Sequence, residues 1–182
     1  MQVKTKKINK SIMLVGLMGC GKTSVGMLLS KHYKMPFFDS DVEIEKASNI
    51  SISDFFANYG EAEFRKGEEK IISRLLNDEP SVIATGGGAF ISENTRSMAN
   101  ENALTIWINA DVEVLYERTS KSDRRPLLKN TDIRAKLTNL LNERQKFYSQ
   151  AKIVVPTYKE TARSTSRRVI KAIDEYLKQS ED

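Results

Sequence analysis

The sequence has little of what would cross-link it, bind a metal through histidine or hold it in a membrane. Its one cysteine, Cys20, excludes an internal disulfide framework and favours a reducing compartment. Its one histidine, His32, has no companion at metal-ligand spacing, so we expect no catalytic role for it. No apolar run approaches the roughly 20 residues that cross a bilayer, and residues 12–17 are too short for the apolar part of a signal peptide. These absences predict a cytoplasmic protein without a membrane partner.

Positive charge is in slight excess, and most of the excess lies in one place. The 182 residues include 29 Lys and Arg and 24 Asp and Glu, a net charge of +5. Residues 1–10 hold four lysines and no acidic residue, so the rest of the chain carries only +1. Without a basic stripe or an aromatic RNA-binding motif elsewhere, we expect no nucleic acid partner. The length predicts a single domain spanning residues 1–182.

One stretch carries a motif with a known physical mechanism. Residues 11–24 read SIMLVGLMGCGKTS, an apolar run that leads into G-x-x-x-x-G-K-[ST] without a mismatch. Glycines let backbone N–H groups converge on phosphate oxygens, and the following helix adds its free N-terminal amides. The alternative is a chance match on a glycine-rich turn, which the strand pattern before the loop and the helical pattern after it disfavour. The residues expected to bind a nucleotide here are Gly19, Cys20, Gly21, Lys22, Thr23 and Ser24.

Two carboxylates follow the second apolar run, residues 35–38, in the sequence Asp39-Ser40-Asp41. Open parallel sheets bind ligands just beyond the carboxyl ends of their strands. There, one acid can hold Mg²⁺ and the other can accept a proton from a substrate hydroxyl. The alternative is helix capping by Ser40 or Asp41. For Asp41 we favour the catalytic role, whereas for Asp39 both interpretations stay open.

A third apolar run, residues 81–85, ends in Gly86, Gly87 and Gly88. Glycines at the end of a buried strand indicate that something approaches the backbone closely, although a flexible turn is the simpler alternative. The run lacks the terminal acidic residue that usually supports the metal in proteins with this phosphate loop. Asp39 is therefore the candidate for that duty, together with the hydroxyl of Thr23.

Strands and helices are predicted to alternate along the chain. The strands are expected at residues 12–15, 35–38, 81–85, 104–108 and 153–155, and the helices at 22–33, 42–47, 51–59, 61–77, 92–100, 112–118, 133–150 and around 169–177. This alternation predicts an α/β fold, with a five-stranded parallel sheet flanked by helices on both faces. The polar, charged residues 119–130 are a candidate lid whose arginines can close on phosphate charge.

The order of the motifs closely resembles one family. GLMGCGKTSVG, DSD, GEAEFRKGE, ATGGGA, RRPLL and ERQKFY follow one another as in the shikimate kinases, P-loop proteins of the nucleoside-monophosphate-kinase type. The resemblance covers roughly residues 12–156, and GEAEFR with TGGGA and RPLL in this order is highly specific. It implies phosphorylation of the 3-hydroxyl of shikimate by ATP and Mg²⁺, a step toward chorismate and the aromatic amino acids, carried out by a monomer.

On the nucleotide side, the resemblance implies that Lys22 contacts the β- and γ-phosphates and that Thr23 binds Mg²⁺. Arg125, in the predicted lid, would also reach the phosphates. Arg118 and the loop after Pro156 would border the adenine ring, although that loop matches the family pattern only loosely. Lys22 and Arg125 are thus implied to act in catalysis.

On the acceptor side, the resemblance implies that Asp41 holds the accepting hydroxyl, as a base or as an orienting group. Arg65 and Arg144 would clamp the substrate carboxylate. The local pattern favours a different role for Arg65, because an arginine four residues after Glu61 on a helix is usually a solvated partner of that acid. The resemblance reverses this interpretation, since two planar guanidiniums suit a carboxylate. The residues implied to line the ring of shikimate are Gly86, Gly87 and Gly88.

Cys20 departs from the family, in which small residues are usual at this loop position. A thiol at a helix N-terminus beside Lys22 is expected to be reactive. We therefore expect alkylating agents to inactivate the enzyme and ATP to protect it.

Three other interpretations stay open. A gluconate-type sugar-acid kinase would share the loop and the fold, although GEAEFR and TGGGA favour shikimate. A P-loop GTPase is suggested by residues 120–123, SKSD, which come within one residue of the guanine-reading N/T-K-x-D pattern, but no D-x-x-G switch follows a strand. The third is a catalytically silent homologue that acts as a binding module. This interpretation is disfavoured, because the sequence has a charged residue at every position where the family is expected to have one.

Overall fold

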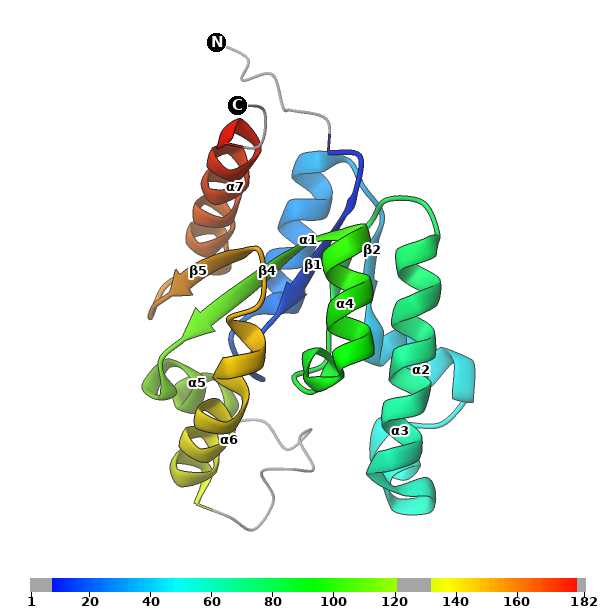
Figure 1. Ribbon diagram of the computed structural model, residues 1–182. Helices are drawn as coiled ribbons and strands as arrows, with labels where there is room; N and C mark the ends of the chain where they lie inside the picture. The colour runs from blue at the N-terminus through cyan, green and yellow to red at the C-terminus, as the bar shows by residue number, and fades with distance from the viewer. Residues whose placement is uncertain (1–7, 121–131, 180–182) are drawn as a thin grey trace.

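The computed structural model describes residues 8–120 and 132–179. Strands and helices alternate along it, as the sequence predicts (Figure 1). The strands are β1 (Ser11–Val15), β2 (Phe37–Asp39), β3 (Val82–Ala84), β4 (Ala103–Ala110) and β5 (Ile153–Thr157). The helices are α1 (Lys22–Tyr33), α2 (Ser40–Ser48), α3 (Ile52–Asn77), the 3₁₀ turn η1 (Ala89–Ile91), α4 (Glu93–Asn102), α5 (Val112–Thr119), α6 (Ile133–Tyr148) and α7 (Ala162–Gln179).

The five strands form one parallel sheet in the order β2-β3-β1-β4-β5. In the central strand β1, Leu14 is paired with Ala84 of β3 and with Ile106 of β4. All five residues of β1 are buried, because helices cover both faces of the sheet, which explains the apolar run at residues 12–15. On one side α1 packs against α7, and on the other α3 packs against α4 (Figure 1). The predicted fold is confirmed.

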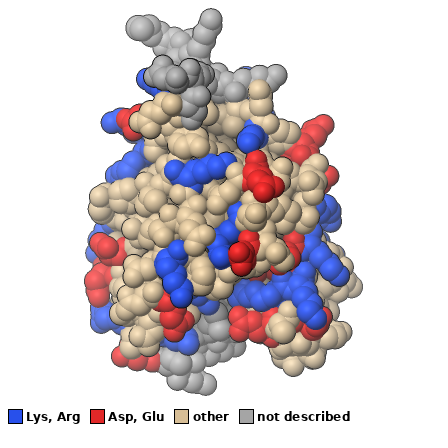
Figure 2. All heavy atoms as spheres, in the orientation of Figure 1, with Lys and Arg blue, Asp and Glu red and all other residues tan. Residues whose placement is uncertain are grey.

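Parallel strands all end at the same edge of the sheet. The phosphate loop at residues 16–21, the start of α2 and the glycines at residues 86–88 therefore leave the sheet side by side. Acidic and basic side chains are interspersed over the face of the molecule in Figure 2. Within the described residues, no helix combines the length and apolar character needed to span a bilayer.

α3 bends at Gly60, where φ is 78° and ψ is 174°. This backbone conformation is essentially restricted to glycine. Gly60 separates the two helical segments that the sequence predicts at residues 51–59 and 61–77. Gly67 stands in the regular part of the same helix, and an added Cβ would meet no atom within 4 Å at either glycine. The two glycines thus differ in backbone conformation and not in the space around them.

Cys20 lies in the hydrophobic core and not on the surface of the phosphate loop. Its side chain is 1% exposed. Its Sγ lies 3.7 Å from the Nζ of Lys22 and would be 3.1 Å from a Cβ added to Gly16. This burial contradicts the expectation that alkylating agents reach the thiol readily in the folded protein, because the loop packs the side chain underneath itself.

Replacing Gly60 by alanine should lower the free energy of unfolding by about 1–3 kcal/mol, because a residue with a Cβ is strained in this conformation. Replacing Gly67 by alanine should raise it by about 0.4–1 kcal/mol, because alanine favours the helix and restricts the unfolded chain. Urea unfolding of the two single variants measures both changes. Equal effects at the two positions would show that the bend does not depend on glycine.

The thiol of Cys20 should react with iodoacetamide only when unfolding exposes it. Mass spectrometry should find the native protein unmodified after a time that suffices for full alkylation in concentrated urea. Since the chain has a single cysteine, any thiol adduct reports on this position. Rapid modification of the native protein would instead show that the phosphate loop opens readily.

Candidate active site

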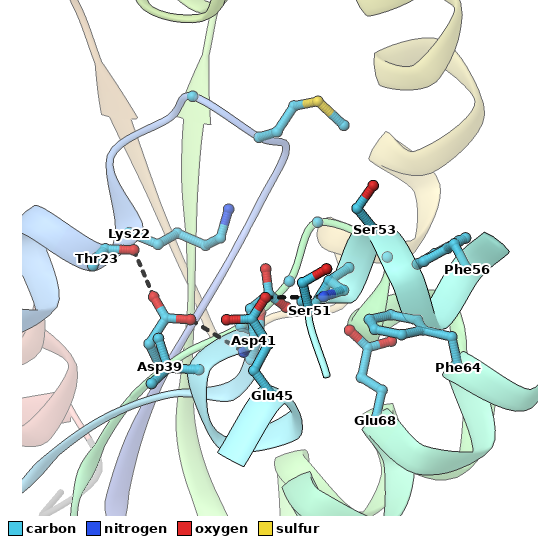
Figure 3. Close-up of a pocket in the computed structure, with 18 of the residues that line it drawn as sticks. Lys22, Thr23, Asp39, Asp41, Glu45, Ser51, Ser53, Phe56, Phe64 and Glu68 are labelled. Atoms are coloured by element: carbon cyan, nitrogen blue, oxygen red, sulfur yellow. Dashed lines mark hydrogen bonds between the residues drawn. The ribbon is translucent and has the colours of Figure 1, made fainter. Parts of the chain in front are cut away.

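A cavity of about 880 Å³ lies where the phosphate loop, α2, α3 and the glycines after β3 meet. In Figure 3 Lys22 and Thr23 lie on one side of it, Phe56 and Phe64 of α3 lie on the other, and Asp41 lies between them. The predicted site residues that line the cavity are Gly19, Gly21, Lys22, Thr23, Ser24, Asp39, Asp41, Arg65, Gly86, Gly87, Gly88, Arg118 and Arg144.

The phosphate loop leaves the N-terminus of α1 open. Gly21 is the N-cap residue, and no side chain of the described residues caps the helix. The first turn of α1 also holds no acidic residue. Its backbone N–H groups and positive dipole end are therefore available to an anion, as the motif predicts.

Lys22 places a buried cation beside the loop. Its Nζ donates to the carbonyl oxygens of Gly16 at 2.8 Å and of Leu17 at 3.1 Å, and the residue is only 8% exposed. These bonds satisfy the ammonium group at the edge of the cavity while the helix N-terminus stays open. Positive charge is thus concentrated where a phosphate group would arrive.

Asp39 makes two contacts with its two carboxylate oxygens (Figure 3). The hydroxyl of Thr23 donates to Oδ2 at 2.8 Å, and the backbone N–H of Asp41 donates to Oδ1 at 3.1 Å. Asp39 is thus the N-cap of α2, which is one of its two open interpretations; Ser40 and Asp41, the other capping candidates, are the first two residues of the helix. The adjacent oxygens of Thr23 and Asp39 fit Mg²⁺, which proteins often bind through one or two side chains together with phosphate and water. Among the described residues, no cluster of three or more His, Cys, Asp or Glu forms a complete metal cage.

Asp41 faces the glycine turn from the first turn of α2. A Cβ added to Gly86 would lie 2.7 Å from its Oδ1, so the glycine permits the carboxylate to approach. Burial, and then the neighbouring Asp39, raise the pKa of Asp41, while Lys22 and Arg65 act in the opposite direction. A carboxylate with a raised pKa is a better proton acceptor than a solvated one, which suits the predicted role.

Arg65 is held in the cavity wall by two carboxylates of its own helix. Its Nη2 pairs with Oε1 of Glu61 at 3.1 Å, as the spacing predicts, and its Nη1 pairs with Oε2 of Glu68 at 2.6 Å. Sequence reasoning missed Glu68, although its position three residues after Arg65 on a helix could have indicated it. A Cβ on Gly88 would collide with the Arg65 guanidinium. The guanidinium therefore lies directly against the glycine turn.

Arg144 reaches the same turn from α6. Its Nη1 donates to the carbonyl oxygen of Gly87 at 3.1 Å, and the residue is 8% exposed. Two guanidiniums from distant parts of the chain, those of Arg65 and Arg144, thus meet at consecutive glycines. The structure brings together the two arginines that the resemblance implies, and their role in binding a carboxylate stays a prediction.

Arg118 joins the phosphate loop to the segment after β5. Its Nη1 donates to the carbonyl oxygens of Gly19 at 3.4 Å and Cys20 at 3.2 Å, and its Nη2 to those of Tyr158 at 2.9 Å and Glu160 at 3.3 Å. Arg118 and the loop after Pro156 are thus neighbours, as expected, and adenine binding there stays a prediction.

Two predicted features are not among the residues brought together here. Arg125, with most of the candidate lid at residues 119–130, lies outside the described residues. Cys20 contributes its backbone to the phosphate loop, but it does not line the cavity, because its side chain turns into the core.

Comparisons by sequence point to one family. A family model described as shikimate kinase matches residues 18–174. A shikimate kinase of Paramagnetospirillum magneticum is 46% identical over 171 residues, which are 94% of this chain and 88% of that protein. A shikimate kinase of Caulobacter vibrioides is 48% identical over 148 residues, which are 81% of this chain and 74% of that protein.

Solved structures agree with the sequence comparison. The shikimate kinase from Acinetobacter baumannii in complex with shikimate has a TM-score of 0.89 and 32% identity, covering 93% of this chain and 95% of that one. A gluconokinase from Sinorhizobium meliloti 1021, with a TM-score of 0.57, 16% identity and coverage of 95% and 99%, shares the fold alone. Since the family model and these relatives match most of its length, the chain belongs to the shikimate kinase family.

Proposed function

We propose that this chain transfers the γ-phosphoryl group of ATP to the 3-hydroxyl of shikimate, giving shikimate 3-phosphate and ADP on the route to chorismate and the aromatic amino acids. Membership of the family implies ATP as the phosphoryl donor. The observation that carries the proposal is the convergence of the phosphate loop, Asp41, Arg65 and Arg144 on one cavity. Such a cavity suits a small anionic polyol and a nucleotide placed end to end.

The nucleotide phosphates are proposed to bind at the open N-terminus of α1, with Lys22 neutralising the β- and γ-phosphates. Thr23 and Asp39 would hold Mg²⁺, which supplies further positive charge to the phosphates when bound. Arg125 is proposed to contact the phosphates, and Arg118 to border the adenine ring. These assignments combine the open helix terminus and the Thr23–Asp39 contact with the family resemblance.

The acceptor is proposed to bind between the glycine turn and α3. Arg65 and Arg144 would bind the carboxylate of shikimate, and charged hydrogen bonds of this kind contribute about 1.5–3 kcal/mol each. The ring would lie against the turn of Gly86, Gly87 and Gly88. Asp41 would then hold the 3-hydroxyl, as a base or as an orienting group.

The chemistry follows from charge and position. Phosphoryl transfer needs the nucleophile in line and the developing charge neutralised more than it needs covalent catalysis. Lys22 supplies a fixed cation at the donor, and Asp41 aligns the accepting hydroxyl, as a base or as an orienting group. The raised pKa of Asp41 supports the role of a base.

Statements about domain organisation, oligomeric state, location and partners are part of the same proposal. The chain acts as one domain over residues 1–182 and as a monomer. It works in the cytoplasm, and it has neither a nucleic acid nor a membrane partner. These statements rest on composition and on the family resemblance.

A coupled assay of ADP release tests the function, with ATP and Mg²⁺ and with shikimate, gluconate or no acceptor. We expect release that depends on shikimate. Release with gluconate alone would retain the fold and the phosphate loop but discard the carboxylate clamp. No release with either acceptor would favour the silent binding module.

Replacing Arg65 by lysine should raise the KM for shikimate by about tenfold or more and leave the KM for ATP within about twofold, because an ammonium group cannot reproduce a planar, forked contact. Steady-state kinetics measure both constants. Arg74→Lys is the matched control, since Arg74 lies on the same helix, is 51% exposed and pairs with Glu43 away from the cavity. An unchanged KM for shikimate in the Arg65 variant would remove this residue from the site.

A further inference from the structure

The glycine turn between β3 and η1 is anchored through its backbone. The N–H of Gly86 donates to the hydroxyl of the buried Ser40 at 3.0 Å. The carbonyl oxygen of Gly86 accepts from the N–H of Ala89 at 3.2 Å, and that of Gly88 accepts from the N–H of Ile91 at 3.1 Å. These bonds hold both ends of the turn in place.

The carbonyl oxygen of Gly87, in the middle of the turn, accepts two hydrogen bonds from α6. One comes from Nη1 of Arg144 and the other from the hydroxyl of Tyr148. Tyr148 is fully buried, and its ring packs against that of Trp107 with 5.8 Å between the ring centroids. Tyr148 does not line the cavity, so it touches the turn from behind.

The direction of this carbonyl also sets the direction of the next N–H group. Described peptide bonds are all trans, and in a planar trans peptide the C=O of Gly87 and the N–H of Gly88 point in opposite directions. Since the carbonyl faces α6, the N–H of Gly88 faces away from it. Among the described residues this N–H has no hydrogen-bond partner, and Gly88 lines the cavity on the side where Arg65 lies.

We propose that Tyr148 is a positioning residue for the acceptor: through the carbonyl of Gly87, it aims the N–H of Gly88 at an oxygen of the bound shikimate. This role rests on the proposed function. Tyr148 acts from outside the cavity and touches neither substrate.

Arg144 alone would hold the carbonyl less well. Its guanidinium is assigned to the substrate carboxylate, so the carbonyl of Gly87 and the substrate compete for its N–H groups. Tyr148 has no such second task, and burial raises the pKa of its hydroxyl, which keeps it a proton donor throughout the working pH range. The tyrosine therefore holds the turn while the arginine serves the ligand.

Tyr148→Phe tests the role, because phenylalanine keeps the buried ring and removes the hydroxyl. We expect the KM for shikimate to rise about tenfold, while kcat and the KM for ATP change by less than about twofold, the pattern of a contact equally strong in ground and transition states. Tyr33→Phe is the matched control. Its buried hydroxyl has no hydrogen-bond partner among the described residues, so all three constants should stay unchanged.

A second measurement uses the wild-type protein and does not depend on how a variant folds. Gly86-Gly87 and Gly87-Gly88 are the two places in the sequence where glycine follows glycine. Glycine labelled with ¹³C at its carbonyl and with ¹⁵N therefore gives two carbonyl-to-amide correlations, and one of them joins the carbonyl of Gly87 to the N–H of Gly88. On titration with shikimate, the proton shift of Gly88 should move downfield, because that N–H gains an acceptor.

The outcomes separate this role from the function on which it rests. A wild-type protein without shikimate-dependent ADP release would overturn both. With an active wild type, an unchanged KM for shikimate in the folded Tyr148→Phe protein would overturn the role of Tyr148 alone. If kcat and both KM values worsened by the same factor, the role of Tyr148 would also be overturned, because that result would indicate a purely structural role. An unchanged proton shift of Gly88 on binding would also overturn it, because that N–H would then gain no acceptor in the complex.

Discussion

The parallel pairing of β1 with β3 and β4 is the constraint on which the whole site depends. Because the strands run in the same direction, the phosphate loop after β1 and the glycine turn after β3 leave the sheet at one edge, beside Asp39 at the end of β2. The helices that return the chain then bring in the arginines, Arg65 from α3 and Arg144 from α6. A different strand order would move the phosphate loop, the glycine turn and Asp39 apart along this edge, even if each kept its local structure.

Burial gives the site its electrostatic character. Burial has the largest effect on the pKa values of the Asp41 and Glu68 carboxyls, and it raises both. The guanidinium of Arg65 acts in the opposite direction on both. The cavity thus holds carboxylates that ionise with difficulty next to the cations Lys22 and Arg65. Charged contacts of partly buried groups are stronger than those on the surface, so a few residues can bind an anion here.

Local patterns in the sequence predicted the parts of the site that depend on local structure. The phosphate loop and Asp41 could be found this way, because a strand, a loop and a helix start are neighbours in sequence. Arg65 could not, since its spacing from Glu61 indicates a surface pair, and a family resemblance was needed to place it in the site. The role of Tyr148 depends on a contact with Gly87 across the fold. For Cys20, the position at a helix N-terminus predicted an exposed thiol, but the loop packs this side chain into the core.

The two partners of Arg65 differ in a way that bears on how a substrate could bind. The Glu61 side chain is 58% exposed, whereas that of Glu68 is 3% exposed. An exposed ion pair contributes little, so a substrate carboxylate can replace Glu61 at small cost. Removing the buried Glu68 from the guanidinium would leave an unpaired charge in a dry site, which is far more costly. The buried pair with Glu68 therefore fixes the direction of the Arg65 guanidinium, and under the proposed function the contact with Glu61 is the one that a substrate carboxylate would replace.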